Sequence, residues 1–201
     1  MGRIVRLNEQ QISRIVKKVL LENERGLLKE AKGSIDKNTL VTTYDYYNNK
    51  GSDGTFKEIF KPEIDAGKQP FVSFTNGCAT KVSLALAKAG QEVDAAFRTT
   101  SGTQKGTPIQ TSANGLKNNL IKKWGQPDVK FSGSISESNL LKKIGTGKTG
   151  ILICTPCGFS GASGHATVWS RIFGTQKTGG TRDNTTYHLN NPEANIYYWY
   201  V

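Results

Sequence analysis

Residues 76–90 read NGCATKVSLALAKAG, and they place a cysteine where a loop meets a helix. Apolar residues recur along the pattern from Val82 to Leu86, and Gly90 is a typical helix stop. The preceding residues, SFTNG, are typical of a loop, so we expect Cys78 in the first helical turn. Backbone N–H groups at a helix N-terminus, together with the helix dipole, favour an anion. This placement favours the thiolate of Cys78 and could hold the oxyanion of a tetrahedral intermediate.

A cysteine nucleophile needs a base, and histidine is scarce, because the chain contains only His165 and His188. His165 starts the alternating pattern HATVWSRI (165–172), directly after the small-residue loop GASG. A strand-end histidine opposite a helix-start cysteine is the arrangement of papain-like hydrolases. From spacing alone, a packed thiol and a hydrogen-bonded structural histidine remain the simpler explanation of Cys78 and His165.

The segments around this pattern predict helices first and strands after them. The expected helices span 40–48, 55–60, 78–89 and 112–124, with a helical turn at 140–144, and the expected strands span 150–154, 165–172 and 195–201. The NNKGSDG segment between the first two helices is typical of a turn, and the stretch 174–182, rich in Gly, Thr and Lys, of a mobile loop. This order favours an α+β domain with an antiparallel sheet.

The N-terminal residues form an amphipathic segment of their own. Apolar residues recur at three- and four-residue spacing between Ile12 and Leu20, basic residues occupy the other side, and Asn8 is the expected N-cap. The segment lacks the uninterrupted apolar run of a secretory signal. We therefore divide the chain into an N-terminal helix with its linker (1–35) and a main domain (36–201). The helix could pack on the domain or on a partner, serve in delivery, or lie on a membrane surface.

Composition narrows the classes of function. The 201 residues carry 27 Lys and Arg against 16 Asp and Glu, a formal net charge of +11, which favours an anionic partner such as nucleic acid, acidic lipid or an acidic polymer of the cell wall. No apolar run approaches the roughly 20 residues that cross a bilayer. Neither a helix-turn-helix nor an RNP-like or paired-CxxC finger pattern is visible, and a phosphate-binding loop is also missing. A basic binding module without catalysis nevertheless remains the alternative to an enzyme.

Two further cysteines, Cys154 and Cys157, follow the expected strand 150–154 in the sequence CTPC. A disulfide between them would suit an oxidising compartment. Unmodified thiols are the second possibility. A zinc site built from Cys78, Cys154, Cys157 and His165 is the third, although structural zinc sites usually have a second close pair of ligands. The pair does not start a helix in a βαβ context, which disfavours a redox motif.

Several motifs in order resemble the type VI secretion amidase effectors of the fourth family, small bacterial toxins with a papain-like, NlpC-type fold. The matching segments are NGCATKVSLALAKAG (76–90), PIQTSANGLKNNLIKKWGQP (108–127), TGKTGILIC (146–154), GHATVW (164–169) and YYWYV (197–201). Lys81 stands where the family pattern has arginine. The resemblance covers about residues 40–201 and leaves the N-terminal segment outside it.

The resemblance implies an enzyme that hydrolyses peptidoglycan stem peptides between D-glutamate and meso-diaminopimelate. Cys78 would be the nucleophile and His165 the base. Asp183 would orient the imidazole, because it is the only Asp after His165, and Asn184 or Asn190 is the substitute if it does not. Neither a metal nor another cofactor is expected.

The same resemblance implies partners and a place of action. A cognate immunity protein is expected, and residues 1–35 are a candidate contact with an injection apparatus. The protein would leave the producing cell without a signal peptide and act in the periplasm of a target cell. Nucleic acid is not expected as a partner.

Overall fold

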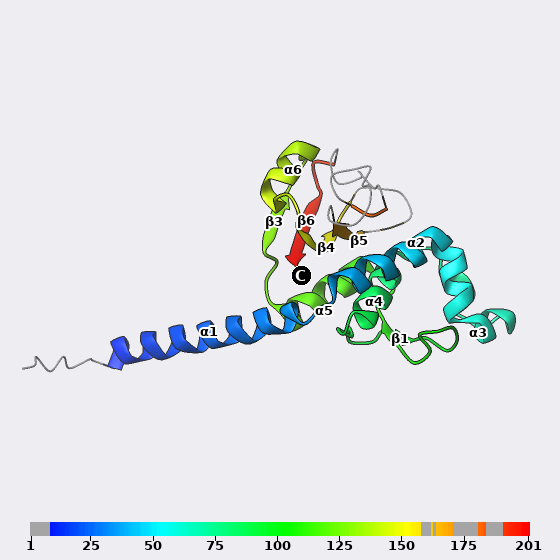
Figure 1. Ribbon diagram of the computed structural model, residues 1–201, viewed down its shortest axis with the longest axis horizontal. Coiled ribbons are helices and arrows are strands. Elements are labelled where there is room, and N and C mark those ends of the chain that lie inside the picture. Colours follow the sequence, from blue (N-terminus) through cyan, green and yellow to red (C-terminus); the bar gives the residue numbers. More distant parts are fainter. Residues whose placement is uncertain (1–8, 158–161, 163, 171–180, 184–190) are drawn as a thin grey trace, which may run out of the picture.

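A computed structural model describes residues 9–157, 162, 164–170, 181–183 and 191–201. The helices are α1 (Glu9–Gly33), α2 (Lys37–Ile59), α3 (Lys61–Asp65), α4 (Cys78–Lys88), α5 (Ala113–Trp124) and α6 (Glu137–Ile144), with a 3-10 turn η1 at Phe71–Ser73. The strands are β1 (Phe97–Arg98), β2 (Pro108–Ile109), β3 (Val129–Ser132), β4 (Thr149–Cys154), β5 (His165–Ser170) and β6 (Asn195–Tyr200). The arrangement is the expected mixture of helices and an antiparallel sheet (Figure 1).

The main sheet has the strand order β3-β6-β4-β5, and each neighbouring pair is antiparallel. Strand β4 lies inside the sheet, and all six of its residues are buried. Its glycine, Gly150, lies between strands β5 and β6, where it pairs with Trp169 and Tyr200. A side chain at position 150 would overlap the Trp199 carbonyl oxygen and the Tyr198 ring. Gly150 therefore allows the three strands to approach one another.

Helices cover both sides of this sheet. Helices α2, α4 and α5 and one face of the sheet share a core that includes Tyr44, Leu86, Leu116 and Trp199. The other face packs against α6 through a second cluster that includes Trp169. A third, aromatic cluster joins α2, η1 and β1 below the sheet, and its phenylalanines are Phe56, Phe60, Phe71, Phe74 and Phe97. The start of α4 thus packs within this main core.

Helix α2 differs from the expected pair of short helices. It runs from Lys37 to Ile59 as one element, with a break in its backbone at Gly51. Gly51 has φ 70°, a conformation that glycine adopts without the penalty of a side chain. The Asp36 side chain caps the helix by accepting hydrogen bonds from the backbone of Asn38 and Thr39. The turn predicted from NNKGSDG is therefore a kink inside one helix.

Other differences are small. Helix α5 begins after the Ser112 cap and ends at Gly125, as expected. Strand β3 was not predicted from the sequence. It lies between α5 and α6 in the chain, so the strands do not all come after the helices. Helix α1 extends to Gly33, so part of the linker expected at the end of the segment 1–35 is helical. Most of the stretch 174–182 lies outside the described residues.

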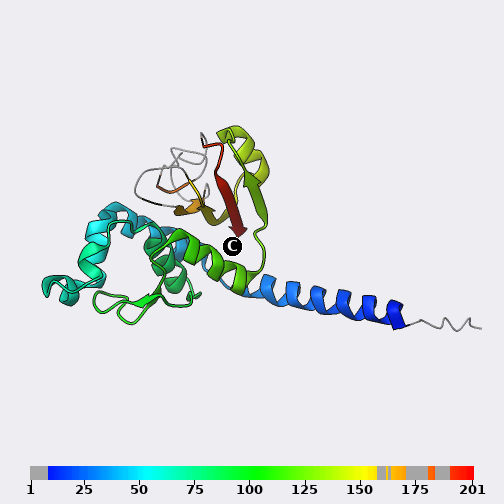
Figure 2. The same ribbon diagram turned by 180° about the vertical axis from the view of Figure 1, so that it is seen from behind.

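Helix α1 extends away from the domain (Figures 1 and 2). Its apolar residues are about half exposed: Ile12, Ile15, Val16, Val19, Leu20 and Leu21. The interpretation in which this face packs on the domain is therefore wrong for these residues. The chain joins the core just after the helix, because Ile35 is buried. Over the part of the chain that is described, no helix has the length and apolarity to cross a membrane.

We predict that Gly150→Ala destabilises the domain by about 1–3 kcal/mol, because the new methyl group must displace backbone atoms of β6 rather than a flexible side chain. Urea unfolding measures the change. Gly26→Ala is the control, since a methyl group at that exposed helical position meets no atom within 4 Å. Equal stability of the Gly150→Ala variant and the unmodified protein would contradict the close approach of these strands.

Candidate active site

Cys78 is the first residue of α4 and is buried, with 7% of its surface exposed. It is also the free cysteine of the described residues. Gly77 is the N-cap of this helix and makes no side-chain hydrogen bond to it. A first-turn residue keeps its backbone N–H outside the helical ladder, and the Cys78 N–H faces the Asn76 side chain, whose Oδ1 lies 3.4 Å away.

Gly77 brings this turn close to α2. Its backbone N–H donates to Ser52 Oγ at 3.0 Å, and a Cβ at this position would lie 3.0 Å from the same oxygen. Ser52 directly follows the kink residue Gly51. The kink in α2 and the start of α4 are thus fitted to one another, directly before Cys78 in the chain.

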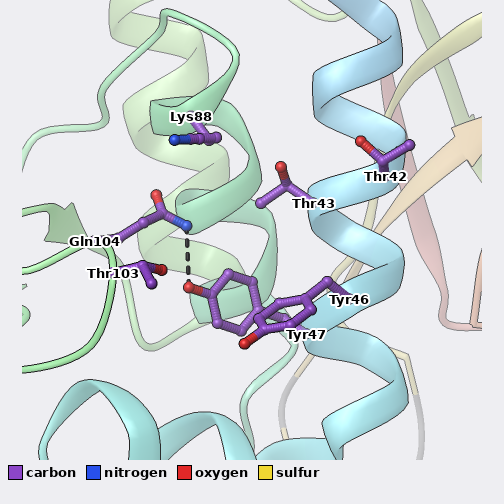
Figure 3. A pocket seen from close by; sticks show the side chains of 7 residues that line it. All are labelled: Thr42, Thr43, Tyr46, Tyr47, Lys88, Thr103 and Gln104. Atoms are coloured by element: carbon purple, nitrogen blue, oxygen red, sulfur yellow. Dashed lines mark hydrogen bonds between the residues drawn. The ribbon is translucent and has the colours of Figure 1, made fainter.

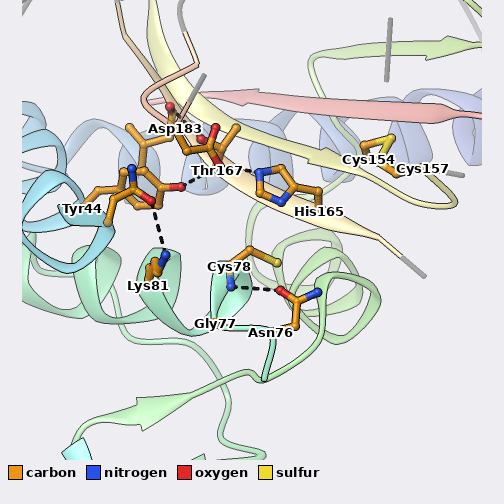
Figure 4. A network of polar contacts seen from close by, with 12 residues as sticks. Tyr44, Asn76, Gly77, Cys78, Lys81, Cys154, Cys157, His165, Thr167 and Asp183 are labelled. Atoms are coloured by element: carbon orange, nitrogen blue, oxygen red, sulfur yellow. Dashed lines mark hydrogen bonds and ion pairs between the residues drawn. A yellow bond between two sulfur atoms is a disulfide. The ribbon is translucent and has the colours of Figure 1, made fainter. Parts of the chain in front are cut away.

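His165 lies opposite, at the start of β5, where its backbone pairs with Cys154 of β4. Figure 4 shows its ring above the Cys78 side chain, and the two side chains interact electrostatically. His165 Nε2 also lies 2.5 Å from Asp183 Oδ2. Since Nε2 contacts Asp183, the Nδ1 atom remains for the side of the thiol and a substrate.

Asp183 is almost enclosed, with 8% of its side chain exposed against 13% for His165. Tyr44 of α2 donates a second hydrogen bond to the same Oδ2 atom, at 3.1 Å. Burial, together with the Asp183 charge, raises the pKa of Tyr44 well above its ordinary value, so its hydroxyl keeps its proton and donates. The structure therefore brings Cys78, His165 and Asp183 together. Asn184, Asn190 and His188 lie outside the described residues.

The electrostatics of this group favour a charged imidazole. Burial alone would lower the pKa of His165, but the hydrogen bonds and charges of Asp183 and Cys78 act in the opposite direction and raise it to about 10. The ring thus keeps both protons at neutral pH. A histidine in this state can donate a proton to a leaving amine beside a cysteine nucleophile.

Lys81 follows Cys78 by one helical turn and is buried, with 8% of its surface exposed. Its Nζ donates to Asn48 Oδ1 of α2 at 3.3 Å. Burial lowers the pKa of Lys81, and the negative charges of Asp183 and Cys78 oppose that shift. The sequence distinguished Lys81 only as a departure from a family pattern. Its electrostatic interaction with Asp183 was not predicted.

Cys154 and Cys157 form a disulfide at the end of β4. The bond lies next to His165, which pairs with Cys154 across the sheet (Figure 4). Of the three possibilities for the CTPC sequence, the structure therefore contains the disulfide. The zinc alternative fails, because two of its four ligands are bonded to one another. Among the described residues no three His, Cys, Asp or Glu side chains are grouped as metal ligands.

A separate pocket of about 200 Å³ lies between α2 and the loop after β1 (Figure 3). Thr43 and Tyr46 of α2 line it, and on the other side Gln104 donates a hydrogen bond to Tyr47 Oη at 3.1 Å. None of Cys78, His165 and Asp183 borders this pocket. This pocket is therefore separate from the group of Cys78, His165 and Asp183 where α4 meets β5.

A helix-start cysteine beneath a strand-start histidine, on an antiparallel sheet, defines a papain-like cysteine hydrolase of the NlpC type. A family model described as type VI secretion system amidase effector protein 4 matches residues 74–199. The chain belongs to this family of antibacterial effectors, which are peptidoglycan amidases. The expected fold class is thereby confirmed, and the binding module without catalysis is not the class that the match supports.

Solved structures share the fold. The type VI effector Tae4 from Enterobacter cloacae superposes with a TM-score of 0.59 at 20% identity, over 83% of this chain and 96% of that chain. The Tae4–Tai4 effector–immunity complex from Salmonella Typhimurium gives a TM-score of 0.58 at 20% identity, over 83% and 98%. A comparison with curated protein sequences finds no match.

We predict that Asp183→Asn moves the alkaline limb of the pH profile of kcat/KM to lower pH, because the carboxylate helps to raise the pKa of His165 to about 10. The measurement is the initial rate of muropeptide cleavage between pH 5 and 11. Asp65→Asn, at an exposed ion pair of α3, is the control. An unchanged alkaline limb in Asp183→Asn would contradict the assigned electrostatics.

The same shift affects stability. A pKa raised in the folded state contributes stability that is fully present below the unfolded value of 6.5 and is lost as the pH rises towards about 10. The difference in unfolding free energy between the unmodified protein and Asp183→Asn should therefore be largest at and below about pH 6 and should shrink steadily between about pH 6.5 and pH 10.

Proposed function

We propose that this chain cleaves peptidoglycan stem peptides by covalent catalysis, with Cys78 as nucleophile, His165 as proton carrier and Asp183 as the group that orients the imidazole. The observation that carries the proposal is the continuous set of contacts from Cys78 through His165 to Asp183. A buried pair of this kind is costly unless each charge is compensated, and here the carboxylate also accepts a hydrogen bond from Tyr44. Such an arrangement is typical of a reaction centre rather than of ordinary packing.

The proposed reaction begins with attack of the Cys78 thiolate on the carbonyl carbon of the amide. Negative charge moves to the carbonyl oxygen, where backbone N–H groups in the first turn of α4 can stabilise it. The C–N bond then breaks, and the Nδ1 proton of His165 passes to the leaving amine. This leaves a thioester on Cys78 and a neutral imidazole.

Water completes the cycle. His165 accepts one proton from a water molecule, which attacks the thioester carbonyl, and the C–S bond breaks to release a carboxylic acid and the thiolate; the acid then loses its proton to solvent. Throughout, Asp183 accepts the Nε2–H hydrogen bond and therefore keeps Nδ1 directed at the reacting atoms. For the substrate we propose the amide between D-glutamate and meso-diaminopimelate, as the family resemblance implies. The net charge of +11 would attract the protein to the anionic wall.

For localisation and partners we propose delivery by an injection apparatus into the target cell, with action in its periplasm. An oxidising compartment is compatible with the disulfide between Cys154 and Cys157. We also propose a cognate immunity protein, because the relatives from Salmonella Typhimurium and Enterobacter cloacae were solved as complexes with Tai4. Such a partner would protect the producing cell by blocking access to Cys78 and His165.

We further propose the division into a delivery segment (1–35) and an amidase domain (36–201). Helix α1 extends away from the domain and leaves an apolar face half exposed, from Ile12 to Leu21 (Figure 2). None of the contacts among Cys78, His165 and Asp183 involves this helix. An apolar helical face that the domain does not use is a suitable contact for a component of an injection apparatus.

We predict that Cys78→Ala lowers the rate of muropeptide release by at least about a thousandfold while the fold is retained, because the thioester can no longer form. Release from purified sacculi is measured by liquid chromatography and mass spectrometry. Ser138→Ala on α6, far from the site, serves as the matched control. Cleavage by the Cys78→Ala variant at a rate close to that of the unmodified protein would rule out this mechanism.

We predict that replacing Ile15 and Val19 by serine leaves the amidase rate in vitro within about twofold and abolishes delivery into target cells, because the apolar face of α1 would no longer bind its partner. The control is a variant in which Gln10 and Lys17, on the opposite side of the helix, are replaced by serine. Competition assays measure delivery, and sacculus cleavage measures activity. Normal delivery by the Ile15 and Val19 variant would remove α1 from the proposed pathway.

A further inference from the structure

Helix α2 carries two neighbouring residues that reach the segment holding Asp183. Tyr44 Oη donates to Asp183 Oδ2 at 3.1 Å. Asp45 accepts two hydrogen bonds from Arg182, one from Nε to Oδ1 at 2.9 Å and one from Nη2 to Oδ2. Two consecutive residues of α2 therefore contact two consecutive residues of the Asp183 segment, across a gap of almost 140 positions in the sequence.

The geometry of the ion pair restricts movement more than a single contact would. The planar guanidinium meets both carboxylate oxygens, which fixes the direction as well as the distance of the pair. Its side chains are largely shielded, with 10% of Arg182 and 29% of Asp45 exposed. The ion pair between Lys57 and Asp53 on the same helix is different, because 64% and 81% of those side chains are exposed. Exposed pairs of that kind contribute little.

Strand β5 also holds this segment through its backbone, in addition to the contact between the His165 and Asp183 side chains. Arg182 N donates to the Val168 carbonyl oxygen of β5 at 2.9 Å, and Thr181 forms an isolated bridge with Trp169. These contacts set the distance of the segment from β5. These backbone contacts allow the Asp183 carboxylate to turn, and the side chains that meet it or its neighbour from α2, Tyr44 and Asp45, restrict that rotation on the side away from His165.

We propose that Asp45 and Arg182 are positioning residues of the amidase, and that with Tyr44 they hold the Asp183 carboxylate against His165. This inference rests on the proposed function, because these residues act through Asp183 and His165. It extends the catalytic apparatus to α2, which lies before the start of the family match at residue 74.

The expected effect on kcat follows from the dependence of the rate on the orientation of the His165 imidazole. A carboxylate displaced by about 1 Å no longer fixes the imidazole, and misplacements of this size cost roughly a hundredfold in rate. Since neither Asp45 nor Arg182 is assigned a contact with substrate, their loss should lower kcat and leave KM nearly constant. Loss of either member should have the same consequence, because the ion pair acts as a unit.

The experiment is a double-mutant cycle with Asp45→Asn, Arg182→Gln and their combination, assayed on a soluble muropeptide at 25 °C. Tyr44→Phe tests the direct hydrogen bond, and Arg182→Lys tests partial rescue by a conserved charge. Asp53→Asn is the matched control, because it makes the same chemical change at an exposed ion pair of the same helix. Circular dichroism and melting curves give the folded fraction of each variant.

We expect each single variant of the ion pair to lower kcat by about tenfold or more with KM within about twofold, and the double variant to be no more than about threefold below the lower single. Arg182→Lys should retain more activity than Arg182→Gln. Unchanged kcat, effects that multiply, or losses that only follow the folded fraction would overturn the inference. If the unmodified protein and Asp53→Asn also fail to cleave the muropeptide, the proposed function itself is wrong.

Discussion

The hydrogen bond between His165 Nε2 and Asp183 Oδ2 joins two groups that the fold has removed from water. A buried carboxylate and a buried imidazolium each carry a large desolvation cost, so neither charge is stable there without the other. The contact raises the pKa of His165 and directs Nδ1 towards Cys78. The thiol, the backbone groups of α4 and any substrate can cooperate only if this pair stays in place.

Three parts of the fold converge on that pair. Strand β5 supplies His165 through its register with β4, whose residue Gly150 allows the strands to pack closely. Helix α4 supplies Cys78, and its start is fitted to the kink of α2 through the contact between Gly77 and Ser52. The same helix α2 reaches the carboxylate through Tyr44. The kinked helix therefore contacts the start of α4 before Cys78 and also the Asp183 carboxylate. Its irregular residue, Gly51, directly precedes Ser52, which makes the first of these contacts.

Local patterns explain why part of the site could be predicted from the sequence. Cys78 and His165 stand at the starts of a helix and a strand, which periodicity and glycine placement reveal. Asp183 was selected as the last aspartate and by family resemblance, and its role remains a proposal. The contacts of Tyr44 and Asp45 have no local signal, because they join residues almost 140 positions apart. Strand β3 was missed because four residues with a half-buried pattern are too few to show a period. The glycines of NNKGSDG indicated a turn, but packing of both halves of α2 on the core keeps the helix continuous apart from its kink.

Nitrogen NMR of the imidazole rings can decide whether Asp183 keeps His165 charged beside Cys78. The chain has only two histidines, so a His188→Gln variant assigns the signals of His165. We predict that both ring nitrogens of His165 are protonated at pH 7 and that the ring titrates with a pKa of about 10. A neutral ring at pH 7, with an ordinary pKa near 6.5, would contradict it.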